Sequence, residues 1–244
     1  MDLDFVDQPL DWASPQHGGA DAAPPAAPQR LTSERSTRTR PQEHRRTLPG
    51  ERDGVVALPI GGDPARWPVT LAEFAPWWLA EPGLDTSRGR RVPPAGPAKA
   101  AIMVLVADPE RDDTDRLLSN DDGAMLNAML QACGLRRDEV YVASVLPRHT
   151  PAADWEALAQ TQLGAVLRHH LMLAAPRRLW VFGREVMTLL APEMLDRNGV
   201  GAVSPGGPSH DLQVPVLGGY PLAAIRRRPA LKRSWWERWL AFSS

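Results

Sequence analysis

The stretch "AAIMVLVA", residues 100–107, decides the fold because it is an unbroken apolar run that ends at a turn. Such a run is typical of a strand covered on both faces, since a strand with one wet face would alternate apolar and polar residues. Further strand-like segments follow at 139–145, 177–183 and 212–219, and amphipathic segments separate them. Strands that alternate with helices are joined by right-handed crossovers and pair in parallel. We therefore expect an α/β fold, a three-layer α/β/α sandwich around a central, mainly parallel four-stranded sheet.

The connecting segments carry helical apolar spacing. We expect helices over 122–133, 154–173, 184–190 and 229–242. Gly134 is placed to end the first of them. In the last one Trp235 and Trp239 are four residues apart, which predicts that both rings pack into the core.

The chain before the first strand differs in composition. Residues 1–60 are rich in Pro, Ala, Gln, Ser and Arg and lack a periodic apolar pattern, which predicts a disordered tail. Within 61–98, Thr70 and Glu73 have the spacing of a capping box, and a short docking helix with a Pro/Gly-rich connector is expected. Its apolar face comprises Leu71, Phe74, Trp77 and Trp78. We expect residues 99–244 to form the α/β domain.

Charge and cysteine content restrict the partners and the compartment. The 244 residues have a formal net charge of -1, so any contact with nucleic acid must come from a local basic patch. Cys133 is the single cysteine, which excludes an intramolecular disulfide and a cysteine-based metal site and fits a cytoplasmic protein. The acidic start "MDLDFVDQPLDW" and the lack of an 18-residue apolar run indicate neither export nor a membrane partner.

Ligands of parallel α/β sheets bind at the carboxyl ends of the strands. The loops expected there begin at 107–109, 144–147, 183–184 and 218–221. The acidic run 108–115 lacks the spacing and the glycine of a calcium loop, so we interpret it as a solvated loop and predict no metal site. Its charge, with that of Asp121 and Asp122, disfavours tight DNA binding. No glycine-rich phosphate loop follows the first strand, which argues against a nucleotide-binding domain.

Segments over about 100–242, taken in order, resemble the uracil-DNA glycosylase superfamily, most closely its bacterial and archaeal iron-sulfur branch. "MVLVADPE" is similar to the first strand and its acidic loop, and "GAMLNAMLQACGLRRDEVYVASVLPRHTP" is similar to the family segment that leads through the second strand. "PRRLWVFGREVMTLL" looks like the third-strand segment. "VPVLGGYPLAAIRRRPALKRSWW" looks like the final motif, with matching spacing at Pro221, Arg226, Pro229, Lys232 and Trp236.

The resemblance implies a role for each motif position. An enzyme of this family needs a stacking face for the flipped-out base, polar contacts to its edge, an acidic group for water and a donor for the departing base. The acidic role falls on Asp108, the stacking role on Leu118, the amide role on Ser144 and the histidine role on Tyr220. Leucine has no π face, serine offers one hydroxyl, and a tyrosine stays neutral at pH 7. The catalytic pattern is therefore altered at several positions.

The resemblance also bears on cofactors and partners. The cysteines of the iron-sulfur branch have no counterpart, so no cluster or other cofactor is expected, and aromatic packing by Trp67, Phe74, Trp77 and Trp78 is our hypothesis for what replaces it. Two functions stay open: a base-excision glycosylase with weakened or lost hydrolysis of the N-glycosidic bond, and a non-catalytic DNA- or protein-binding module. DNA would contact the basic stretch, and a protein partner the N-terminal tail. The basic stretch comprises Arg226, Arg227, Arg228 and Lys232.

Overall fold

A five-stranded, mostly parallel sheet forms the centre of the protein. The computed structural model describes residues 60–85, 89–190, 196, 199–206 and 213–243, so the predicted tail lies outside the described residues apart from Ile60. The strand order is β2-β1-β3-β5-β4, and only the β4–β5 pair is antiparallel. The strands are β1 (Met103–Val106), β2 (Tyr141–Ser144), β3 (Leu179–Phe182), β4 (Val200–Val203) and β5 (Val214–Gly219).

The prediction of four strands was wrong, because β4 adds a fifth strand at one edge of the sheet. Only Val203 of this strand is buried, and Gly201 interrupts its apolar residues. Glycine is depleted in strands, and an edge strand with little buried surface leaves a weak sequence pattern. The other four strands, by contrast, are those that the apolar runs predicted.

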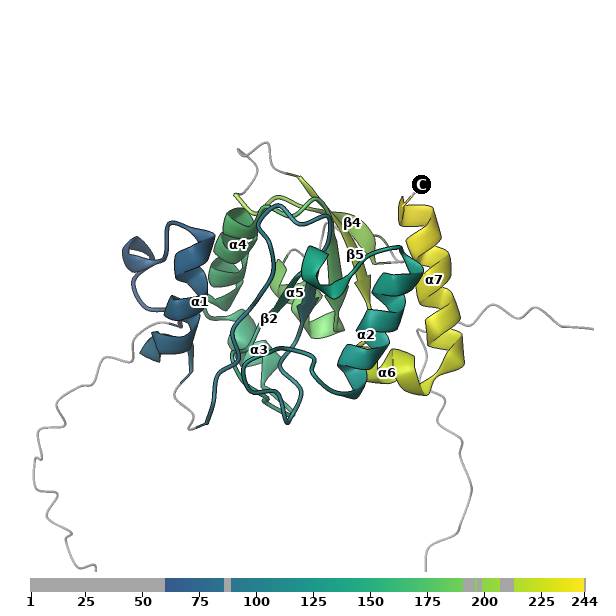
Figure 1. Cartoon of the computed structure of the whole chain (residues 1–244). Coiled ribbons are helices and arrows are strands. Elements are labelled where there is room, and N and C mark those ends of the chain that lie inside the picture. Colours follow the sequence, from purple (N-terminus) through teal and green to yellow (C-terminus); the bar gives the residue numbers. More distant parts are fainter. Residues whose placement is uncertain (1–59, 86–88, 191–195, 197–198, 207–212, 244) are drawn as a thin grey trace, which may run out of the picture. The chain divides into compact units, whose positions relative to one another are not determined.

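Alternate residues of each strand enter two separate cores. In β1, Met103 and Leu105 face one core, while Val104 and Val106 face the other. The first core is covered by α3 (Trp155–Ala159), α4 (Leu163–Ala174) and α5 (Arg184–Leu190), and the second by α2 (Asp121–Ala132), α6 (Leu222–Arg227) and α7 (Pro229–Ser243) (Figure 1). Trp235 and Trp239 are buried in the second core, as predicted.

One helix is interrupted where the sequence predicted continuity. Instead of one helix over 154–173, α3 ends before Gln160 and α4 begins at Leu163. Between them the Thr161 hydroxyl donates to the carbonyl of Leu158, a local bond of the kind that competes with helix continuation. The basic stretch is also divided, because Arg228 has an extended backbone between α6 and α7. A residue before a proline, here Pro229, is disfavoured in the helical region.

Helix α1 (Leu71–Ala80) packs against α4 (Figure 1). The Thr70–Glu73 capping box is present. Phe74 and Trp78 are buried, and Phe74 stacks on His170 with ring centroids 3.8 Å apart. Short 3-10 turns are η1 (Pro64–Arg66), η2 (Pro82–Leu84) and η3 (Arg137–Glu139). Among the described helices, none combines the length and the apolar character that crossing a membrane requires.

Candidate functional site

A cleft of about 690 Å³ opens where β1 and β3 end and where α2 and α6 begin. This is the edge of the sheet at which parallel α/β folds bind ligands. Its base is apolar and its rim is charged. The lining residues are Val106, Ala107, Asp108, Pro109, Glu110, Arg111, Asp112, Leu118, Asn120, Asp121, Asp122, His149, Phe182, Pro221, Leu222, Ala223, Arg226 and Arg227.

Asp108 lies in this cleft, directly after β1. Its Oδ2 accepts a hydrogen bond of 2.8 Å from the backbone N–H of Thr150 and lies 3.1 Å from Nδ1 of His149. Burial raises the pKa of the Asp108 carboxyl above its usual range, while the Thr150 hydrogen bond and the imidazole act in the opposite direction. The carboxylate is therefore fixed by two groups of the loop that follows β2, and its other oxygen has no hydrogen bond among the described residues.

The acidic loop after β1 is built around two of its own carboxylates. Asp113 is buried, and it accepts hydrogen bonds from the backbone of Glu110, Leu118 and Ser119. Glu110 accepts from the N–H groups of Asn120 and Asp122, and so caps the start of α2 in place of an N-cap side chain. The expectation of a wholly solvated loop was therefore wrong, since both carboxylates satisfy backbone donors. Asp112 and Asp115 are exposed.

Leu118 lines the cleft in a left-handed backbone conformation, with φ of 54°. Two contacts hold Leu118 in this conformation. Asp113 accepts a hydrogen bond from the N–H of Leu118, and the first turn of α2 passes close to the carbonyl oxygen of Leu118. A Cβ at Gly123 would come within 1.8 Å of that oxygen, so this turn of the helix needs a glycine. Phe182, at the end of β3, supplies an aromatic ring to the cleft, a contact that the sequence did not suggest.

The basic stretch is only in part available at the cleft. The guanidinium of Arg226 pairs with Asp121 at 2.7 Å and with Asp122 at 3.1 Å, which joins α6 to the start of α2. Arg227 is exposed and lines the cleft, whereas Arg228 and Lys232 are exposed outside it. Arg227 is thus the cation best placed to meet an anionic ligand that enters the cleft.

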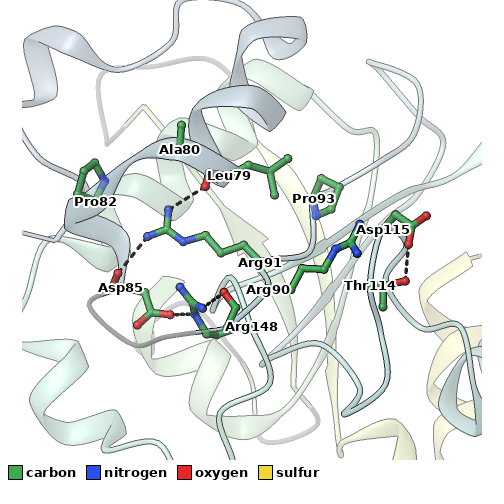
Figure 2. Close-up of a pocket in the computed structure, with 11 residues that line it drawn as sticks. Leu79, Ala80, Pro82, Asp85, Arg90, Arg91, Pro93, Thr114, Asp115 and Arg148 are labelled. Atoms are coloured by element: carbon green, nitrogen blue, oxygen red, sulfur yellow. Dashed lines mark hydrogen bonds and ion pairs between the residues drawn. The ribbon is translucent and has the colours of Figure 1, made fainter.

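A second cleft, of about 550 Å³, lies beside the loop that bears His149 (Figure 2). On its wall Arg148 pairs with Asp85 and also donates to the carbonyl of Gly89. Arg91 donates to the carbonyl oxygens of Trp78, Glu81 and Asp85, at the end of α1 and in the segment after it. Arg148 thereby connects the loop after β2 to the segment after α1, and Arg91 ties that segment to the end of α1.

A sequence model of the Uracil DNA glycosylase superfamily matches residues 93–240, which include all the strands and every helix from α2 to most of α7. The match covers more than half of the 244 residues. The chain belongs to the uracil DNA glycosylase superfamily. A search among curated proteins found no match.

The glycosylase-like motif positions are distributed unevenly around the cleft. Asp108 and Leu118 line it. Ser144 ends β2 beside Val106 but is buried, and its hydroxyl donates to the carbonyl of Leu146 at 2.7 Å. Tyr220 follows β5, is 46% exposed and is not among the lining residues. Of the four residues to which the resemblance assigns roles, the cleft lining thus contains Asp108 and Leu118 but neither Ser144 nor Tyr220.

The described residues offer no three His, Cys, Asp or Glu side chains grouped to hold a metal ion. Cys133 follows α2 and packs against the second core, and burial raises the pKa of its thiol to about 11. A thiol with such a pKa is protonated at neutral pH and is a poor nucleophile and a poor metal ligand.

Proposed function

We propose that the chain is a divergent DNA glycosylase, which hydrolyses the N-glycosidic bond of uracil or another damaged base in DNA at a low rate. The observation that supports this most is the fixed carboxylate of Asp108 in a cleft at the end of β1. A carboxylate held in this way can position a water molecule for attack on the sugar carbon. Membership of the superfamily makes base excision the reaction class to test first.

A low rate follows from the groups around Asp108. Leu118 offers van der Waals contact to a base but no aromatic face. Tyr220 is exposed and outside the cleft lining, so stabilisation of the departing base by that position is reduced. Loss of one preorganised donor costs about 2.7–4 kcal/mol of transition-state stabilisation in well-studied enzymes. We therefore expect turnover to be far slower than that of a glycosylase with all four groups.

An iron-sulfur cluster does not fit this chain. Such clusters are held by several cysteine thiolates, and the sequence has one cysteine, whose thiol is protonated at neutral pH. The resemblance to the iron-sulfur branch therefore concerns the sequence and does not imply that this chain holds the cluster. We propose that the aromatic contacts of α1 and the Asp85–Arg148 pair stabilise the region instead.

Single-turnover cleavage with the full chain in excess tests the proposal. Uracil-containing single- and double-stranded oligonucleotides are incubated with the protein, and abasic sites are cleaved with alkali and counted. We expect slow product formation that Asp108→Asn reduces about 100-fold or more, since misplacing a reacting group by about 1 Å can cost 10²-fold. Asp115→Asn is the matched control, because it removes the same charge from the same loop outside the cleft lining. Equal rates for both variants would contradict the proposal.

A non-catalytic binding module is the second candidate. It is favoured by the exposure of Tyr220 and by the internal hydrogen bond of the Ser144 hydroxyl, which leave two motif positions without contact to the cleft. DNA binding that depends on Arg227, with no base release from any oligonucleotide, would support this candidate over the enzyme.

A further inference from the structure

His149 lies at the cleft, although no sequence pattern suggested a role for it. Its Nδ1 is 2.9 Å from the carbonyl oxygen of Pro109 and 3.1 Å from Oδ2 of Asp108. A carbonyl oxygen can only accept a hydrogen bond, so the proton of the neutral imidazole must lie on Nδ1. Nε2 of the same ring is then an acceptor.

The Nε2 atom has no hydrogen-bond partner within the described part of the chain, and the side chain is 33% exposed. A water molecule or a ligand in the cleft can therefore reach the ring. An imidazole oriented by a carboxylate on one nitrogen and open on the other has the arrangement of a general base.

The loop holds this ring in place from both sides. Arg148, the preceding residue, is tied to Asp85 and to the carbonyl of Gly89, and Thr150, the following residue, donates its N–H to Asp108. Fixing the neighbours on each side reduces the freedom of the imidazole, and preorganisation of this kind is what an acid–base group requires.

We propose that His149 and Asp108 form an acid–base pair in which Nε2 of His149 takes the proton of the attacking water, an inference that rests on the proposed glycosylase function. The water oxygen forms a bond to C1′ of the deoxyribose, and the C1′–N bond breaks with its electron pair moving to the base. The water proton passes to Nε2, and Asp108 stabilises the imidazolium. The base leaves as an anion that recovers this proton, so the products are an abasic sugar and the free base.

Other charged groups also face the cleft and contribute to any pH dependence. Besides Asp108, they are Glu110, Arg111, Asp112, Asp121, Asp122, Arg226 and Arg227. Arg226 is paired with Asp121 and Asp122, and Glu110 binds backbone N–H groups of α2. Among these groups only Asp108 contacts the imidazole, so Asp108 is the carboxylate that orients the ring.

Two measurements on the full chain test the pair. The first identifies the protonated ring nitrogen of His149 by NMR, and we expect the Nδ1–H tautomer because Nδ1 faces the carbonyl of Pro109 and the carboxylate of Asp108. The second is the single-turnover rate with a uracil oligonucleotide. His149→Gln should lower it about 100-fold, with DNA affinity unchanged. His169→Gln, on α4 and outside the cleft lining, should keep the wild-type rate.

The outcomes separate this inference from the proposed function. A wild-type rate in His149→Gln, together with loss of rate in Asp108→Asn, would overturn the pair and leave the glycosylase standing. An Nε2–H tautomer of His149 in the wild-type protein would also overturn the pair, because Nε2 could then not accept a proton. No base release by the wild-type protein would overturn the proposed function, and the role of His149 with it.

Discussion

Gly123 sets the position of Leu118 at the cleft, because the first turn of α2 passes within van der Waals distance of the Leu118 carbonyl. Single residues elsewhere have similar local effects. Asp113 determines the shape of the acidic loop, and His170 joins α1 to the sheet through contacts with Phe74 and Tyr141. Each of these effects can be measured with one substitution.

Replacement of Gly123 by alanine should destabilise the protein. The added Cβ would lie 1.8 Å from a backbone oxygen, so the loop at Leu118 or the helix must move. We expect a loss of about 1–3 kcal/mol in the free energy of unfolding, the usual cost of overpacking, measured by urea denaturation. Asn127→Ala, at an exposed position of the same helix, should change it by less than about 0.5 kcal/mol. Equal stability of the two variants would show that α2 has no need of the glycine.

The buried imidazole of His170 should make the protein sensitive to acid. Burial lowers the pKa of His170 to about 3, whereas an unfolded histidine titrates near pH 6.5. The unfolded chain therefore binds a proton that the folded chain does not, and stability is lost as the pH falls from about 6.5 towards 3. His170→Phe should flatten the fall in Tm between pH 7 and pH 4. Tyr141→Phe removes the same hydrogen bond but keeps the imidazole, so it should lower Tm throughout and retain the slope.

At the scale of elements, α1 is joined to the rest of the fold by aromatic rings. Trp78 is buried and donates its indole N–H to the carbonyl of Val92, and Trp77 is half-buried against Phe74 and Trp67. Phe74 stacks on His170 of α4. These contacts show the aromatic packing on which the hypothesis rests, and the structure adds the Asp85–Arg148 pair in the same region.

The double variant Trp77→Ala, Trp78→Ala tests the aromatic contacts. Removal of one buried tryptophan costs about 3–5 kcal/mol, so we expect a fall in Tm of at least several degrees, measured by circular dichroism. Leu79→Ala is the control on the same helix, because that side chain is 44% exposed and should contribute little. An unchanged Tm in the double variant would refute the hypothesis.

Strands whose side chains are buried on both faces could be predicted from the sequence, and a strand with little buried surface could not. The continuous apolar residues of β1 and β3 are visible in the sequence because both faces of these strands are covered. The edge strand β4 gave no such pattern. The break at Thr161 depends on a local backbone preference that hydrophobic periodicity does not record, whereas the start of the last helix at Pro229 was predicted.

At the scale of the whole molecule, the charges of the cleft determine how DNA could approach. The rim contains Asp112, Asp121 and Asp122, and two of these pair with the single guanidinium of Arg226. Arg227 is an exposed cation at the cleft, as is Arg111, and it lies close in sequence to Arg228 and Lys232. A nearly neutral chain with one such stretch should bind DNA weakly and in a salt-dependent way.

Arg227→Ala should reduce the affinity for single-stranded DNA several-fold and lower the slope of log K against log salt by about one. Fluorescence anisotropy at a series of salt concentrations measures both. The control is Arg177→Ala, which removes an exposed arginine before β3, at the opposite end of the strands. If both variants bind like the wild type, the basic stretch is not the DNA contact.

The family resemblance assigned Leu118 to the site, and the sequence pattern itself could predict a site residue where it directly follows a strand. Asp108 is such a residue, and its place beside the cleft follows from the end of β1. The roles of His149, Glu110 and Asp113 depend on the path of loops that the sequence pattern does not define. A signal was present for His149, which lies a few residues beyond β2 in a loop expected at the same edge of the sheet.

The central claim is that Asp108 serves a slow glycosidic hydrolysis, and one measurement tests it most directly. Wild-type and Asp108→Asn proteins, purified side by side, are incubated in excess with a uracil-containing single strand, and abasic sites are counted over several hours. We predict that abasic sites accumulate with the wild type and fall about 100-fold with the variant. Identical accumulation for the two proteins, or none with either, would contradict the claim.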